Sequence, residues 1–313
     1  MKQQYRFVGA CLSATLLAAC GNGFSSSTPT SVTPLLGSQP AYRTGAQPSA
    51  VTAHKIYVAN FNDNTVTTYK SDGTPTTPTI TKGLNDPRGI AVDSLGKIYV
   101  ANFVDNGTNN DVTSYKPDGT QTTPTITGFC GPTGVAVDKN GKIYVSDVCG
   151  GSGGGSVTTY KPDGTPTLPT ITDGVAEPQG VAVDKNGKIY VSNNGANGDT
   201  WTVTTYNANG QQTLPTITAG LNGNAGISVD ATGKIYVANN GPSPGYVSTY
   251  RPDGKETTPT ITNGYPVGIF AVGPKLYVAD LNGNTVTTYN ALSGKQITPT
   301  ISGLNGPFDV TFH

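Results

Sequence analysis

The sequence repeats one short motif six times, and this repetition constrains the fold more than any other feature. The motif KIYVAN, or a close variant of it, begins at Lys55, Lys97, Lys142, Lys188, Lys234 and Lys275. The tyrosines of the motif follow one another after 42, 45, 46, 46 and 41 residues. A period of roughly 40–45 residues with several short strands per unit is typical of propeller blades. We therefore predict an all-β chain in which residues 51–313 form a six-bladed β-propeller.

Each repeat contains four strand signals. In the unit that begins at Pro87 they are PRGIAVD, KIYVAN, VTSY and TPTIT, separated by turns such as DSLG and KPDG. The fourth carries a proline in every repeat, namely Pro78, Pro124, Pro169, Pro215, Pro259 and Pro299. Because proline lacks the N–H that a central strand uses for pairing, this segment is predicted to be the outer edge strand of its blade.

The phase of the repeats predicts how the ring closes. The chain enters the repeats at a second strand, which begins at Lys55, and ends with an isolated first strand, GPFDVTFH. Six complete blades require the segment 307–313 to join the blade of Lys55. The C-terminal strand is therefore expected to close the ring, so that every sheet face is covered.

The N-terminal residues have the pattern of a lipoprotein signal. Lys2 and Arg6 flank a short apolar run, and residues 17–20 (LAAC) are similar to a bacterial lipobox. We expect residues 1–19 to be a signal peptide, Cys20 to be lipidated, and residues 20–50, rich in Ser, Thr, Pro and Gly, to form a flexible linker. Since Gly21 rather than Asp follows the cysteine, the expected location is the bacterial outer membrane or cell surface. An ordinary signal peptide with a chance cysteine is the alternative.

Two cysteines, Cys130 and Cys149, lie within the repeats. Around the hairpin turn between them, paired residues have numbers that sum to about 279, as Val137 and Lys142 do, and the two cysteines share that sum. They are thus expected to face each other just beyond the paired strands. Export to an oxidising compartment favours a disulfide over the alternative of two buried free thiols.

The repeats resemble a known family. The segments GIAVDSLGKIYVANFVDN and GVAVDKNGKIYVSD resemble NHL repeats, and KIYVAN followed by NTVTTY is also similar to the related YVTN-type propeller repeat. The resemblance extends over about residues 51–313 and implies a propeller fold. It implies no single function, because NHL-like propellers include RNA-binding modules, sensor domains and a metal-dependent lyase.

The chain offers few groups for catalysis. Lys and Arg balance Asp and Glu at 19 each, which argues against a nucleic-acid partner. After the signal only His54 and His313 remain as histidines, expected together at the ring closure, and they do not match the histidine ligands of the lyase. A structural role for both is favoured over a zinc site. The recurring hairpin residues Asp93, Asp138, Asp184 and Asp230 are likewise interpreted as scaffold.

One ring of polar residues is a candidate calcium site. An Asn or Asp ends each second strand, at Asn60, Asn102, Asp147, Asn193, Asn239 and Asp280. Such oxygens suit Ca²⁺, and six-bladed calcium-dependent lactonases hold their metal at the channel mouth with similar ligands. Only two of the six are acidic, however, and the same side chains also cap strand ends. A Ca²⁺-dependent lactonase-like or lyase-like enzyme is therefore the alternative function.

The preferred function is binding. The loops between second and third strands vary most, and the three longest are consecutive: 102–111, 147–156 and 193–202. Neighbouring blades would place them as one wall beside the channel mouth, with candidate ligand-binding residues Phe103, Asn110, Asp111, Asp199, Trp201 and, on the next loop, Tyr246. Aromatic rings among amides and carboxylates suit a glycan, a peptide or another small ligand. We thus predict an interaction module for an envelope or extracellular partner that needs no cofactor, the alternative being that the long loops are tolerated insertions.

Overall fold

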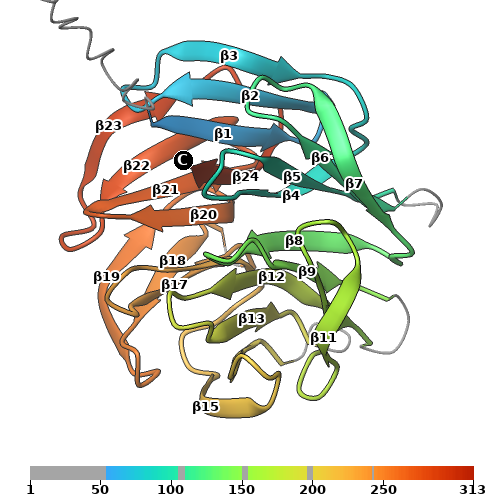
Figure 1. Cartoon of the computed structure of the whole chain (residues 1–313). Helices are drawn as coiled ribbons and strands as arrows, with labels where there is room; N and C mark the ends of the chain where they lie inside the picture. The colour runs from blue at the N-terminus through green and yellow to red at the C-terminus, as the bar shows by residue number, and fades with distance from the viewer. Residues whose placement is uncertain (1–53, 105–109, 150–153, 196–199, 242) are drawn as a thin grey trace, which may run out of the picture. The chain divides into compact units, whose positions relative to one another are not determined.

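Twenty-four strands form six four-stranded antiparallel sheets, the blades of a propeller (Figure 1). The structure is a computed structural model, and it describes residues 54–313 except for 105–109, 150–153, 196–199 and 242. The predicted signal peptide, Cys20 and the linker therefore lie outside the described residues. No helix in the described part of the chain is long and apolar enough to cross a membrane. The predicted all-β, six-bladed fold is confirmed.

Within each blade the strands follow one another from the axis of the ring to its rim. Two blades consist of β24 (Pro307–Phe312), β1 (Lys55–Asn60), β2 (Thr65–Lys70), β3 (Pro75–Ile80) and of β4 (Pro87–Val92), β5 (Ile98–Asn102), β6 (Asp111–Tyr115), β7 (Gln121–Thr127). The next two consist of β8 (Pro132–Val137), β9 (Ile143–Asp147), β10 (Ser156–Tyr160), β11 (Pro166–Ile171) and of β12 (Pro178–Val183), β13 (Ile189–Asn193), β14 (Thr202–Tyr206), β15 (Gln212–Ile217). The last two consist of β16 (Asn224–Val229), β17 (Ile235–Asn239), β18 (Tyr246–Tyr250), β19 (Glu256–Thr262) and of β20 (Pro266–Val272), β21 (Lys275–Asp280), β22 (Thr285–Asn290), β23 (Gln296–Ile301).

The hydrophobic core lies between the blades. Most of its clusters combine residues of two adjacent sheets: Val58 and Val310, for example, pack with Tyr277 and Val286 of the preceding blade. The second strands are buried on both faces, which explains why the KIYVAN motif has no alternation of apolar and polar residues. The innermost strands β24, β4, β8, β12, β16 and β20 contact one another in that order around the axis.

The C-terminal strand closes the ring as predicted. β24 pairs with β1 in antiparallel register, with Val310 opposite Val58. The ladder continues one residue beyond β24, because the Lys55 N–H donates to the His313 carbonyl at 2.7 Å and the His313 N–H to the Lys55 carbonyl at 3.0 Å. The His54 ring stacks on Phe312, which in turn stacks on Tyr277 of the neighbouring blade. Both histidines thus belong to the closure, where the sequence predicted them.

The outer rim repeats one contact between blades, which we call the rim contact. The prolines of the fourth strands lie on the outermost strands, as predicted, and each receives a turn glycine of the following blade. The glycine–proline pairs are Gly119–Pro78, Gly164–Pro124, Gly210–Pro169, Gly254–Pro215, Gly294–Pro259 and Gly73–Pro299. At Gly119, φ is +84° and an added Cβ would lie 2.5 Å from the Pro78 Cβ, so any side chain would clash there. The motif PDG therefore serves packing between blades as well as the turn.

The hairpin aspartates have the scaffold role that the sequence predicted. Asp93 Oδ1 accepts the N–H groups of Leu95 and Lys97, both at 2.9 Å, while its Oδ2 accepts the hydroxyl of Tyr99 at 3.3 Å. Burial, and then the Asp93 carboxylate, raise the pKa of Tyr99. The same aspartate–tyrosine bond recurs at Asp138–Tyr144, Asp184–Tyr190 and Asp230–Tyr236.

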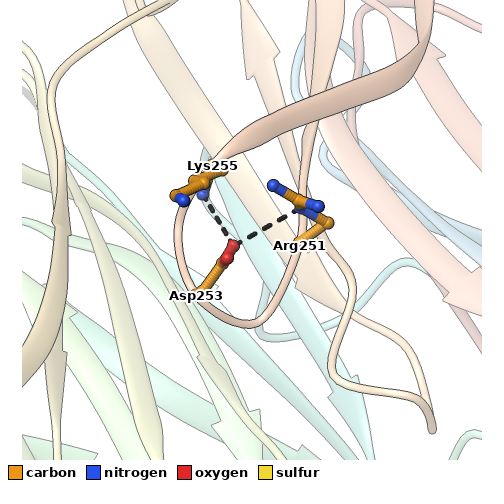
Figure 2. A network of polar contacts seen from close by, with 3 residues as sticks. All are labelled: Arg251, Asp253 and Lys255. Carbon is orange, nitrogen blue, oxygen red and sulfur yellow. Dashed lines mark hydrogen bonds and ion pairs between the residues drawn. The ribbon is translucent and has the colours of Figure 1, made fainter.

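The turn between β18 and β19 shows the chemistry of the rim turns (Figure 2). Asp253 Oδ1 accepts the Lys255 N–H at 3.1 Å and lies 3.6 Å from the Arg251 Nε. The N–H bond recurs in equivalent turns, at Asp72, Asp118 and Asp163. Because both charged side chains are more than half exposed, this ion pair adds little stability. The turn is held by its backbone bonds.

Candidate functional site

The inner strands surround a cavity of about 420 Å³ on the axis of the ring. Most of its lining consists of Val, Ile, Ala and Gly from β4, β8, β12, β16, β20 and β24. Polar and charged groups are few, and they include Arg88, Gln179, Asn240, Tyr265 and Asp309. A cavity of this size that is lined largely by apolar residues and carries a few polar side chains is a usual form of small-molecule site.

Five of the six inner strands bring a glycine to the same level of the cavity. These glycines are Gly89, Gly134, Gly180, Gly226 and Gly268, one residue before an aligned Ile or Val. They allow adjacent inner strands to approach closely. A Cβ added to Gly89, for example, would lie 2.7 Å from the Val135 backbone nitrogen and 2.8 Å from the Gly134 Cα.

The sixth inner strand, β24, carries Asp309 at this level. Its carboxylate accepts the Ile90 N–H of the next blade at 3.0 Å and the Val310 N–H at 2.9 Å. Asp309 is the only acidic residue among those that line the cavity, and no ion pair with it is found in the described part of the chain. Burial raises its pKa to about 7, against the two backbone hydrogen bonds, which lower it.

Arg88 stands one residue before Gly89, surrounded by phenylalanines. Its guanidinium carbon lies 3.5 Å from the ring centroid of Phe103, 5.2 Å from that of Phe308 and 5.8 Å from that of Phe61. We call these four residues the Arg88 cluster. Contacts of this kind contribute about 1 kcal/mol each and fix the plane of the guanidinium.

The Arg88 cluster also breaks the repeat. Phe61 and Phe103 directly follow the second strands β1 and β5, where the other blades have Val148, Asn194, Asn240 and Leu281. Arg88 and Phe308 begin the inner strands, where the others have Thr133, Gln179, Ala225 and Val267. Phe61 and Phe308 belong to the blade in which β24 closes the ring, and Arg88 and Phe103 belong to the blade that follows it, all on the face where the blade-to-blade loops enter the inner strands.

The ring of residues that was considered for calcium is bonded to the blades. All six side chains are buried. Asn102, Asn193 and Asn239 each accept, through Oδ1, an N–H of the loop that leads into their own blade, at 2.9–3.1 Å. Asp147 and Asp280 accept the equivalent loop N–H groups of Gly131 and Tyr265.

Asn60 differs from the other five: its Nδ2 donates to Thr65 and Thr67, and its Oδ1 has no partner among the described residues. Because most oxygens of the ring already hold loop amides, the ring fits the strand-capping role better than a Ca²⁺ site.

The residues of the predicted ligand-binding wall differ in burial and in their hydrogen-bond partners. Asn110 is buried, where its Oδ1 accepts the Val104 N–H at 2.5 Å and its Nδ2 donates to the Cys130 carbonyl, so it braces its own loop. Asp111 accepts the Asn102 amide at 2.7 Å, and burial raises its pKa.

The aromatic members of this wall are half-buried. Trp201 packs on the core between two blades, and Tyr246 donates weakly, at 3.4 Å, to the Gly220 carbonyl. Asp199 lies outside the described residues. Of the described members of the wall, only Phe103 stands beside the axial cavity, as a member of the Arg88 cluster.

Cys130 and Cys149 are joined in a disulfide, with their Cα atoms 5.0 Å apart. The N–H of Val148 donates to the Gly131 carbonyl, which continues the β8–β9 hairpin up to the bridge. Gly131 also lies against the Phe103 ring, so the disulfide stands behind the Arg88 cluster. The one group of His, Cys, Asp and Glu side chains close enough for a metal in the described ranges is Cys130, Asp147 and Cys149, and its sulfurs are already bonded to each other.

Comparison with known proteins identifies the repeats. The family model described as "NHL repeat" matches residues 84–108 and 129–152, which contain the first two strands of two adjacent blades. Two of the six repeats are thus NHL repeats, within a six-bladed β-propeller. No curated protein matches its sequence.

Solved structures share the fold of this propeller at low identity. A chain of a nidogen/laminin complex is 18% identical with a TM-score of 0.67, and the match covers 83% of this chain and 97% of that one. A protein of unknown function from Bacteroides caccae is 12% identical with a TM-score of 0.64, covering 83% and 98%. A gluconolactonase from Xanthomonas campestris is 16% identical with a TM-score of 0.51, covering 72% and 82%. At these identities the likeness shows the fold alone.

Asp309 and Arg88 were missed by reasoning from the sequence. The candidate residues lay at the ends of the second strands and on the long loops that follow them, whereas both of these residues lie on inner strands, where the other blades have another residue. Aligning the six first strands supplies the missing signal: the column of Asp309 is otherwise glycine, and the column of Arg88 holds no second charge. Departures from a repeat are thus more informative here than its recurring polar positions.

Proposed function

We propose that the protein is a cell-envelope lipoprotein whose propeller binds a ligand at the mouth of the axial cavity. The observation that carries the proposal is the Arg88 cluster beside that cavity. It places one cation and three phenylalanine rings on two adjacent blades that otherwise share the repeat scaffold. Aromatic rings and arginine are the residues on which binding energy concentrates in interfaces.

The lipid anchor in this proposal is supported by residues 1–20, with their basic start, short apolar run and LAAC motif. Acyl labelling of the wild type and of Cys20→Ser tests it, with fractionation of the envelope. Labelling of the wild type alone is expected. Equal labelling of both proteins would remove the lipoprotein part of the proposal and leave the binding part in place.

The binding part is tested with Arg88→Ala. We would titrate full-length protein in detergent with envelope glycans and short peptides, following thermal melting and the fluorescence of Trp201, the single tryptophan. Leu95→Ala is the matched control, because Leu95 is 84% exposed on the turn at the opposite end of its inner strand. A probe that binds the wild type and the control alike, and Arg88→Ala at least tenfold more weakly, supports the site. Binding that is unchanged in Arg88→Ala places the site elsewhere.

A Ca²⁺-dependent enzyme is the second candidate, favoured by the likeness to a gluconolactonase in fold. It has less support, because the oxygens of its ring of ligands accept loop amides. Melting with EDTA and with Ca²⁺ separates the two functions. A shift of many degrees between the two conditions favours the metal, since a tightly bound ion stabilises the folded state by mass action.

A further inference from the structure

Asp309 places a carboxylate at the cavity wall, and no cation is paired with it in the described part of the chain. The residue is half-buried there, and two backbone N–H groups replace only part of the hydration of the carboxylate, so its charged form is disfavoured. The other blades have glycine at the same place, so the fold itself does not demand an acid there. An asparagine would accept the same hydrogen bond from Ile90 without the charge.

Ring closure does not explain the residue either. β24 is held by its ladder with β1 and by the backbone bonds between Lys55 and His313, none of which uses the Asp309 side chain. The carboxylate lies on the cavity side of the strand, between the next blade's Ile90 N–H and the preceding blade's Gly268.

The groups that face Asp309 leave its charge uncompensated from within the cavity. Among the residues that line the cavity, Arg88 and Tyr265 are the only others that titrate or carry charge. Neither is among the causes of the altered pKa of Asp309, which are burial and the two backbone bonds. The guanidinium of Arg88 lies over the Phe103 ring instead.

We propose that the axial cavity binds a small organic amine, whose ammonium group pairs with the Asp309 carboxylate while its apolar part lies against the Ile and Val side chains of the inner strands. The inference rests on the proposed function, since it names the ligand class of the same cavity. An ammonium needs one carboxylate and tolerates an apolar wall. Ca²⁺ requires six to eight oxygen ligands, whereas the side chains that line this cavity provide a single carboxylate.

The test is calorimetric titration of the full-length protein in detergent with n-alkylammonium ions from ethyl to hexyl. Affinity should rise with chain length until the cavity is filled, and 1-butanol, the uncharged analogue of butylammonium, should bind at least tenfold more weakly. Asp309→Asn should weaken butylammonium binding at least tenfold and leave 1-butanol binding unchanged. Asp253→Asn, which removes an exposed turn carboxylate, should behave as the wild type.

A second readout does not depend on the folding of a variant. Because the carboxylate must be ionised, butylammonium binding to the wild type should weaken as the pH falls below about 7. Flat pH dependence, undiminished binding to Asp309→Asn, or no alkylammonium binding to the wild type would each overturn the inference. So would displacement of butylammonium by K⁺ or Ca²⁺ at equal charge concentration, which would indicate an inorganic ion. If other probes bind in an Arg88-dependent way while amines do not, the inference fails and the proposed function stands.

Discussion

The outer rim of this propeller has the same contact in every blade, whereas the inner ring differs from one blade to another. At the rim, the glycine–proline contact occurs between every pair of neighbouring blades, including the pair joined by the closure. On the axis, five blades share a glycine and the sixth has Asp309, with Arg88 and its phenylalanines beside it. A contact that is needed to hold blades together recurs in all of them. A charged residue that appears once, where the other blades have glycine, is best explained by binding.

The largest expected effect comes from removing the strand that joins the ends of the ring. Deleting residues 307–313 exposes the edge of β1. It also uncovers Val58 and Tyr277, which belong to the hydrophobic cluster between the closing blade and the preceding one. We expect insoluble or unfolded protein, measured by solubility and circular dichroism. Deletion of residues 21–50 is the control and should leave the melting curve unchanged. A truncated protein that melts like the wild type would show that the rim alone holds the ring.

The disulfide should have the next largest effect. Under the chain-entropy model, closing a loop with a sequence separation of 19 stabilises the fold by about 3 kcal/mol. The pair Cys130→Ser with Cys149→Ser should therefore melt well below the wild type in denaturant titrations. Non-reducing peptide mapping checks the bond directly, and recovery of both cysteines as free thiols would contradict it.

The rim contact can be isolated with matched glycines. Gly119→Ala forces a Cβ against Pro78, whereas Gly128→Ala and Gly303→Ala share the positive φ and meet nothing within 4 Å. In all three variants the alanine must adopt a positive φ, which lowers the free energy of unfolding by roughly 1 kcal/mol. Gly119→Ala should lose about 1–3 kcal/mol more, because overpacking displaces a neighbouring blade. Equal losses in denaturant unfolding would mean that the rim contact does not hold the blades.

Much of the fold could be predicted because its determinants are local and repeated. The prolines marked the outer strands, and the unpaired first strand at the C-terminus showed how the ring closes. The hairpin register placed Cys130 opposite Cys149, where the structure joins them. These features depend on spacing, which a sequence displays directly.

The site was harder to predict, because its chemistry depends on where each side chain points. Spacing showed that an Asn or Asp ends every second strand, but not that Asn102, Asn193 and Asn239 turn their oxygens to loop amides. Asn110 is similarly an internal brace of its loop, although its residue type suits a ligand. Asp309 differs: its place on the axis follows from the repeat alignment, and only the absence of an ion pair with it in the described part of the chain required the structure.

A smaller, pH-dependent effect on stability follows from Asp309. Its folded pKa of about 7 lies above the ordinary 3.8, so its contribution to stability is fully present below the lower value and is lost as the pH rises through about 7. Asp309→Asn should therefore gain melting temperature over the wild type, by a few degrees at pH 8 and by less at pH 5. A difference in melting temperature that does not change between these pH values would show that the carboxylate is not desolvated.

The most direct test of this comparison is the substitution Asp309→Gly, which places on β24 the glycine that the other five inner strands have at this position. Melting of Asp309→Gly and the wild type would be measured at pH 8, each with and without butylammonium. If Asp309 serves binding, the variant is at least as stable as the wild type without the amine, and only the wild type is stabilised by it. A variant that melts several degrees lower, yet gains as much from butylammonium as the wild type, would make Asp309 part of the scaffold and contradict the account.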